Sequence, residues 1–262
     1  LSLILYTLNQ MIKKTHIRSI KSGDILEIFM YKKPLYRGFT IAKKKPSLSV
    51  IPKTLEERLK NRERSMMRSR GKVKRLVNAN AYKWHTISGR PFRPLFLTLT
   101  FKENIRDLKS ANYELTKFIQ RFNYFITHIK RSYCKYLGVP EFQQRGAVHY
   151  HIILFNIPFI ENIYDELKKL WPMGMFKVNA VDNVKNVGNY VSAYMTKGKV
   201  DTRLISQMSY TASKGLLKPK EEWSADKIQK QVAEVPKNFE QFEKDYEDPY
   251  YEATRYIKFS PK

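Results

Sequence analysis

The sequence predicts an α+β fold in which helices flank an antiparallel sheet, and three observations support this prediction. Apolar or alternating stretches of strand length recur after residue 94, amphipathic helical patterns separate them, and a strongly basic region precedes them. The chain has 262 residues, 42% of them hydrophobic, which is enough for a packed core. We expect a basic, helical N-terminal extension (1–93), a central domain (94–200) and a C-terminal extension (201–262).

The central domain can be read element by element. Residues 95–101 alternate threonine with large apolar residues, as a buried strand does. Helical spacing of apolar residues predicts a helix over 109–132. The remaining patterns predict strands at 133–144 and 147–156, a helix at 160–171, a strand at 175–181 and a helix at 183–197. This order predicts a ferredoxin-like, or RRM-like, antiparallel sheet with one extra helix.

The N-terminal extension is dominated by positive charge. Residues 53–75 carry ten Lys or Arg against three Glu, with a weak apolar stripe, so we expect a basic helix that needs a partner surface. A solvated charged face is the alternative, but the bias of the whole chain favours contact with the DNA backbone. The expected DNA-binding residues are Lys43, Lys44, Lys45, Arg58, Arg62, Arg64, Arg68, Arg70, Lys72, Lys74 and Arg75.

The overall charge points to a polyanionic partner. Lys and Arg total 49 against 24 Asp and Glu, a net charge of +25, which favours nucleic acid. No apolar run reaches the roughly 18 residues that span a bilayer, and residues 1–12 lack the pattern of a signal peptide. The single cysteine, Cys134, is typical of a reducing, cytoplasmic setting. No phosphate-binding loop is present, so we expect neither a nucleotide cofactor nor a motor.

Two histidines in the apolar run AVHYHIILF suggest a metal site. His149 and His151 point to the same face of the predicted strand. A three-residue hairpin loop ending at Gly146 places Glu141 opposite His149, on that face too. Two imidazoles and a carboxylate suit Mn²⁺ or Mg²⁺, although Zn²⁺ and Fe²⁺ use such ligands as well. Gln143 is the substitute third ligand, and a pair of histidines on a wet strand face is the alternative.

Two tyrosines on the last predicted helix form the second unusual feature. Tyr190, Tyr194 and Lys197 line one stripe, which flanks the apolar stripe formed by Val184, Val187, Val191 and Met195. Taken alone, the tyrosines are ordinary edge-of-core residues. Beside a divalent ion and an ammonium group, however, a phenol can attack a phosphodiester and store its energy as a phosphotyrosine.

Three motifs in order, LFLTLTF, EFQQRGAVHYHIILF and NYVSAYMTK, resemble those of the HUH endonuclease superfamily, and within it the rolling-circle replication initiators of plasmids and single-stranded DNA phages. The resemblance covers roughly residues 95–200. It implies that His149, His151 and Glu141 bind a divalent metal ion. It also implies that Tyr194 is the nucleophile followed by Lys197, with Tyr190 as the second tyrosine of the two-tyrosine group.

The resemblance further implies single-stranded origin DNA as the substrate, with a host helicase and polymerase as partners in a bacterial cytoplasm. Three other interpretations stay open. A conjugative relaxase shares the chemistry but usually has its tyrosine before the histidines, and a single-tyrosine transposase would not need Tyr190. A non-enzymatic RNA-binding module on a similar sheet would leave His149 and His151 unexplained.

Overall fold

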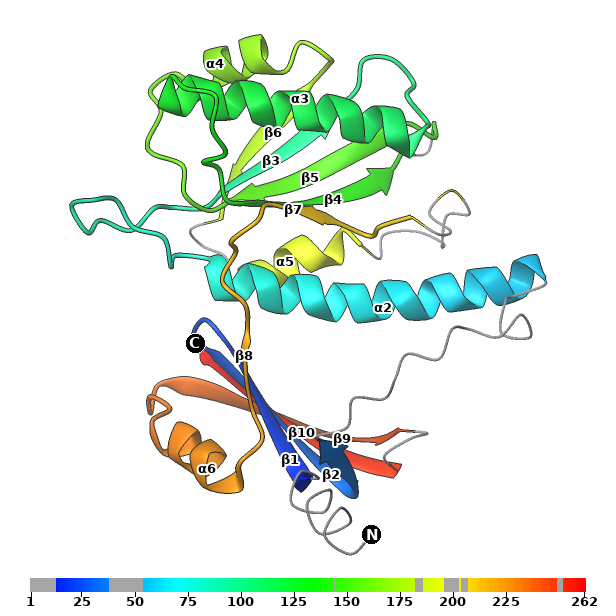
Figure 1. The fold of residues 1–262 in the computed structure, drawn as a ribbon, viewed down its shortest axis with the longest axis vertical. Coiled ribbons are helices and arrows are strands. Elements are labelled where there is room, and N and C mark those ends of the chain that lie inside the picture. The colour runs from blue at the N-terminus through cyan, green and yellow to red at the C-terminus, as the bar shows by residue number, and fades with distance from the viewer. Residues whose placement is uncertain are drawn as a thin grey trace, which may run out of the picture. The chain divides into compact units, whose positions relative to one another are not determined.

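A computed structural model of the chain describes residues 13–37, 54–143, 145–181, 186–195, 203, 207–248 and 252–262. The chain forms two compact units. The central unit comprises residues 53–218, and the split unit joins residues 1–52 to residues 219–262. Each contains one five-stranded antiparallel sheet (Figure 1). None of the described helices is both long enough and apolar enough to cross a membrane.

The sheet of the central unit has the strand order β6-β3-β5-β4-β7. Without β7, this is the order of a ferredoxin-like sheet, in which the first and third strands lie in the middle, so the predicted fold class is confirmed. The elements are β3 (Leu95–Thr100), α3 (Leu108–Thr127), β4 (Tyr136–Phe142), β5 (Val148–Leu154), α4 (Ile163–Leu170), β6 (Phe176–Ala180), α5 (Val187–Ala193) and β7 (Thr211–Ala212).

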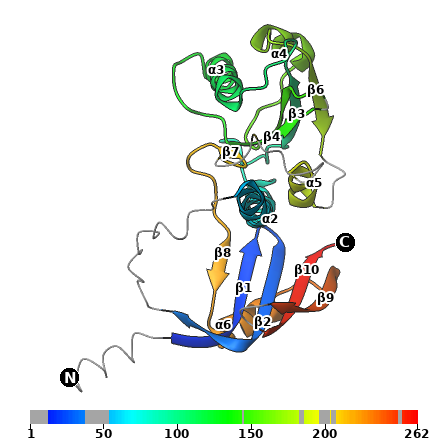
Figure 2. The same cartoon turned by 90° about the vertical axis from the view of Figure 1, so that its right-hand side faces the viewer.

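Both faces of this sheet are covered, and strand alternation decides which side chains go to each. α3 and α4 lie on one face, and α5 and the long helix α2 (Leu55–Asn80) lie on the other (Figures 1 and 2). Leu97, Leu99 and Tyr150 enter the core under α3, whereas Phe96, Val139 and Ile153 enter the core with α2 and α5. His149 and His151 alternate with Tyr150, so they lie on the α5 face.

The helix ends differ from the predicted ones for local reasons. α3 begins after Asp107, whose carboxylate accepts from the Ser110 N–H, and it ends before His128, which takes the left-handed conformation at φ +56°. It therefore stops short of residue 132. α5 is also shorter than the predicted 183–197, since it begins at Asn186 as N-cap. Residues 183–185, 196 and 197 of that prediction lie outside the described residues.

The predicted basic helix is confirmed as α2, and its partner surface is α5. A capping box formed by Thr54 and Glu57 starts it. Its buried side is not the predicted stripe, because Leu55 and Met67 are exposed while Val73 and Val77 are fully buried. The buried residues lie in the C-terminal half, where α2 packs on α5.

The split unit contains elements that the sequence analysis did not predict. Its sheet has the order β8-β1-β2-β10-β9, with one helix, α6, packed against Leu26 and Ile28 through Ile228. The N-terminal extension thus contains strands as well as a helix. The elements are β1 (Lys13–Ser22), β2 (Ile25–Arg37), β8 (Lys220–Glu222), α6 (Ala225–Ala233), β9 (Phe239–Asp248) and β10 (Glu252–Pro261).

Candidate active site

The turn between β4 and β5 decides which side chains of the two strands share a face. Gly146 has φ +87°, the left-handed conformation that glycine adopts most easily. The resulting register pairs Glu141 with His149, as predicted. β3 pairs with the other edge of β5, so that Thr98 lies opposite His151. Four polar side chains from three strands therefore gather on the α5 face.

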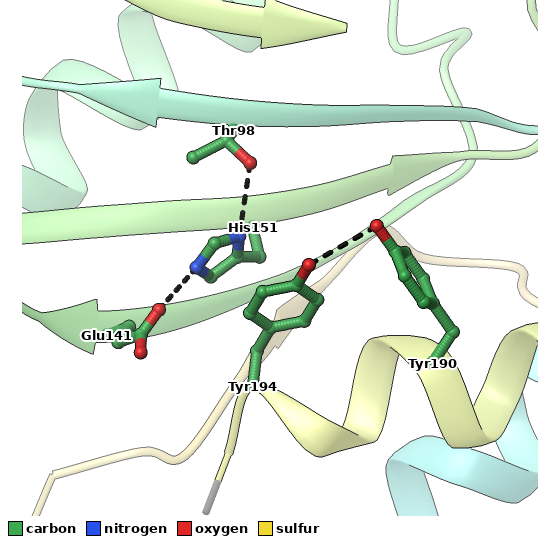
Figure 3. Close-up of polar contacts among 5 residues, drawn as sticks. All are labelled: Thr98, Glu141, His151, Tyr190 and Tyr194. Atoms are coloured by element: carbon green, nitrogen blue, oxygen red, sulfur yellow. Dashed lines mark hydrogen bonds and ion pairs between the residues drawn. The ribbon is translucent and has the colours of Figure 1, made fainter. Parts of the chain in front are cut away.

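His151 is held by four of its neighbours (Figure 3). Its ring stacks on Tyr194 with centroids 3.9 Å apart and lies parallel to Phe96 at 6.0 Å. Its Nε2 is 2.5 Å from Oε2 of Glu141, and its Nδ1 is 3.2 Å from Oγ1 of Thr98. One tautomer satisfies both contacts: Nε2–H donates to Glu141, and the Thr98 hydroxyl donates to Nδ1. The orientation of the imidazole is therefore fixed.

His149 lies farther along the same face, with its ring centroid 6.3 Å from that of His151. Its Nε2 is buried and has no hydrogen-bond partner among the described residues. Burial lowers the pKa of His149, the nearby His151 and Arg145 lower it further, and Glu141 opposes them. The ring is therefore neutral near neutral pH. A neutral imidazole with an unused buried nitrogen is in the form that binds metal ions.

Tyr190 and Tyr194 lie one helical turn apart at the end of α5. The Tyr194 hydroxyl donates to the Tyr190 hydroxyl across 3.2 Å, and the Tyr190 ring packs edge-on against Phe96 (Figure 3). Burial raises the pKa of Tyr194, and the bond to Tyr190 and the charge of Glu141 act in the same direction. The phenol of Tyr194 is therefore neutral in this arrangement, and any reaction that uses it must remove its proton.

Close contact with α2 fixes the position of α5. The Gly188 N–H donates to Oδ1 of Asn78 across 2.8 Å in a buried site. A Cβ at Gly188 would lie 2.2 Å from the carbonyl oxygen of Lys74, so only glycine fits there. Val191 and Met195 are buried beside this contact, as the predicted apolar stripe requires, whereas Val184 lies outside the described residues.

Sequence reasoning missed three side chains on this face: Phe96, Thr98 and Lys177. Phe96 and Thr98 alternate along β3, so period-two spacing was a signal for them. Lys177 is exposed on β6 and lies directly opposite Thr98 in the sheet register. Only the pairing of β3 with β6 reveals that lysine. The predicted Lys197, in contrast, lies outside the described residues.

The predicted DNA-binding residues of α2 differ in exposure. Arg62 is buried, with its Nη1 donating to the carbonyl oxygen of Gln207 across 2.9 Å, and burial lowers its pKa. Its guanidinium thus contacts the protein interior. The others that the structure describes are exposed (Arg58, Arg64, Arg68, Lys72) or half-buried (Arg70, Lys74, Arg75), and Lys43, Lys44 and Lys45 lie outside the described residues.

The residues fit a divalent metal ion in their chemistry. Two imidazoles and a carboxylate are a suitable donor set, and the buried, unpartnered Nε2 of His149 needs a partner. In the part of the chain that the structure describes, however, no three His, Cys, Asp or Glu side chains form a group ready to hold a metal. Glu141 and His151 bond to each other instead. Gln143 is engaged too, because its Oε1 accepts from Nε of Arg145.

Comparison with known proteins adds one finding. Residues 94–199 match the family model for replication-associated proteins of the ORF2 group. The matched range contains Glu141, His149, His151, Tyr190 and Tyr194. Searches of curated proteins and of solved structures gave no match. The central part of the chain is thus similar to replication-associated proteins, which indicates a role in DNA replication.

Proposed function

We propose that this protein initiates rolling-circle replication by cutting and rejoining one DNA strand at a specific site. One observation carries the proposal: the ring of Tyr194 stacks on His151, and the Tyr194 hydroxyl bonds to that of Tyr190. Distant parts of the sequence are thereby joined into one polar group. The similarity of residues 94–199 to replication-associated proteins supports the same conclusion.

Tyr194 is the proposed nucleophile. Its phenol oxygen attacks the scissile phosphorus, a new oxygen–phosphorus bond forms, and the bond to the 3′ oxygen breaks. The phenol gives up its proton, and the departing oxygen takes one up to become a 3′-OH. The products are a 5′-phosphotyrosine and a free 3′ end. Because one phosphate ester replaces another, rejoining needs no nucleotide hydrolysis.

The raised pKa of Tyr194 shows what the surrounding residues must supply. Glu141, His149 and His151 would hold Mg²⁺ or Mn²⁺, which when bound would draw charge from the scissile phosphate and orient it for attack. His151 keeps the tyrosine ring beside that position. Lys197 of the predicted motif is the expected cation that favours the phenolate, and Lys177 approaches the same face from β6.

Tyr190 is the proposed second nucleophile. Replication of a circle ends with a second cleavage while the first phosphotyrosine is still occupied. A phenol whose hydroxyl lies 3.2 Å from that of Tyr194 can reach the same phosphate position. This contact favours a two-tyrosine initiator over a single-tyrosine transposase. A host helicase and polymerase would act with the protein, since no motor motif is present in the sequence.

The metal requirement provides the test. Overlapping single-stranded oligonucleotides covering the DNA around the gene are incubated with Mg²⁺ or Mn²⁺, and nicked products are separated on a denaturing gel. His149→Ala should abolish nicking while leaving most DNA binding intact, and the matched control His128→Ala, in an exposed helix cap, should nick normally. Full nicking by His149→Ala, or by the wild type in excess EDTA, would contradict the proposal.

A further inference from the structure

The sheet of the split unit has two chemically different faces. Alternate residues Leu26, Ile28 and Ile257 face α6 and form a small apolar core with it. The residues between them point to the opposite face. The sheet register places Arg18, Phe29 and Tyr256 in one row across three strands of that face. We call this surface the aromatic face; its other members used below are Tyr31, Trp223, Phe242, Lys244, Tyr246 and Lys258.

The rings of the aromatic face form a continuous series. Phe29 lies 6.4 Å from Tyr31 with the planes nearly parallel, at 9°, and 5.2 Å from Tyr256. Tyr256 in turn lies 6.3 Å from Phe242 on the edge strand β9. The outer rings are accessible, because Phe242 is 50% exposed and Tyr246 is 38% exposed. A row of rings on an antiparallel sheet is a surface on which successive nucleic-acid bases can stack.

Cations accompany these rings. The guanidinium of Arg18 lies 5.9 Å from the ring centroid of Phe29 and 4.9 Å from that of Trp223. The ammonium of Lys258 lies 5.6 Å from the Phe242 centroid. The two acids of this face nearest the rings are engaged: Glu27 accepts from the Tyr256 hydroxyl, and Glu221 pairs with Arg18. Positive groups thus stand among flat apolar surfaces, as polynucleotide binding requires.

The edge strand β9 separates its charges by face. Phe242, Lys244 and Tyr246 pair with Lys258, Tyr256 and Thr254, so they belong to the aromatic face. The alternate residues Glu243, Asp245 and Glu247 point to the other side of the strand. A strand that is acidic overall therefore presents no acid between Phe242 and Tyr246 on the aromatic face. This arrangement favours a polyanion on one face only.

We propose that the aromatic face is a second binding site, for single-stranded polynucleotide, with bases stacked on Tyr246, Phe242 and Tyr256 and phosphates near Lys244 and Lys258. The site belongs to the split unit and uses none of the residues that the proposed nicking reaction needs. It goes beyond that reaction, because it would hold a strand by its bases without reading or cutting it. A second copy of the chain is the competing occupant of such a surface.

The test uses the full chain and fluorescence anisotropy with labelled oligothymidine and oligouridine in EDTA, so that nicking plays no part. Phe242→Ala/Tyr246→Ala should weaken binding by about tenfold or more, as removal of two stacking rings predicts. Tyr124→Ala, which removes an equally exposed ring from α3, should bind like the wild type. Lys244→Gln/Lys258→Gln should lower the slope of log K against log salt by about 0.7 for each phosphate that is no longer neutralised.

Photocrosslinking with iodouracil-substituted strands provides a second measurement, and peptides containing Phe242, Tyr246 or Tyr256 should carry the crosslinks. Tighter binding of either oligonucleotide supports the site and identifies its polynucleotide. Unchanged affinity in both folded double variants overturns the proposal. So does a concentration-dependent dimer that Phe242→Ala/Tyr246→Ala abolishes without changing DNA affinity. Nicking is assayed separately, so its presence or absence leaves this result unaffected.

Discussion

At the scale of single residues, the site depends on how His151 is held. The sequence predicts that His149, His151 and Glu141 share a face, because strand alternation and a hairpin turn are local features. The contacts with Thr98 and Phe96 could not be predicted in the same way. They exist only because β3 pairs with β5 across a helix and a hairpin, and no local pattern fixes that register.

The hydroxyl of Thr98 should matter for the metal site. Thr98→Val keeps the shape of the side chain but removes the hydrogen bond to Nδ1 of His151. Removing such a supporting interaction typically weakens metal affinity or activity about tenfold or more. Isothermal titration with Mn²⁺ and the nicking rate measure both quantities. Thr98→Ser restores the hydroxyl and should restore both, so equal defects in the two variants would refute a role for the hydrogen bond.

The thiol of Cys134 should be unreactive in the folded protein. Burial raises the pKa of Cys134 to about 12, well above the ordinary 9.0, so the thiol stays protonated at neutral pH. Labelling with Ellman's reagent should be much slower in buffer than in urea. Because the folded state keeps a proton that the unfolded state loses, the free energy of unfolding should also fall as pH rises above 9.0. Rapid labelling of the native protein would contradict this account.

At the scale of elements, the seam between α2 and α5 positions the tyrosines. The sequence predicts both helices from their periodicity, but α5 is too short to be stable alone and depends on its packing. Gly188 and Asn78 form that contact, and neither stands out in the sequence. The strands of the split unit were missed for a related reason: charged residues interrupt their alternation, as in Phe239–Asp248, and cross-strand pairing with the other end of the chain supplies what is lacking.

A methyl group at Gly188 should therefore disrupt the site. Gly188→Ala places a Cβ against the Lys74 carbonyl oxygen and Asn78, and should cost roughly 1 to 3 kcal/mol of stability, as overpacking does. Gly71→Ala on α2 is the matched control. There the nearest atom lies 4.0 Å away, so a helical alanine should add roughly 0.5 to 1 kcal/mol. Urea unfolding measures both, and equal effects would refute the proposed seam.

At the scale of the whole molecule, the net charge of +25 should act through exposed residues. Arg58→Gln/Arg64→Gln on α2 should lower the salt slope for single-stranded DNA by about 0.7 for each phosphate that these arginines neutralise. Lys109→Gln/Lys130→Gln removes the same charge from exposed positions in and beyond α3 and should change the slope less. Equal slopes for the two variants would show that α2 contributes only to the general field of the protein.

The division into two units is the feature that sequence reasoning could least supply. Composition separates the two ends of the chain from the middle, but it does not reveal that residues 13–37 and 252–262 pair in one sheet. Hydrophobic periodicity reports on neighbours along the chain, whereas this pairing joins its two ends. The order of elements between residues 95 and 180 was predictable because each strand there neighbours a helix or hairpin that is close in sequence.

The most direct test of the central proposal is the covalent adduct itself. The protein is incubated with a cleavable single-stranded oligonucleotide and Mn²⁺, digested, and analysed by mass spectrometry for a tyrosine carrying a 5′-nucleotide. The expected result is an adduct on Tyr194 that Tyr194→Phe largely loses, that Tyr190→Phe still forms without resolving circles, and that the double variant lacks. An adduct that persists in the double variant, or strand cleavage that leaves no protein attached, would contradict the account.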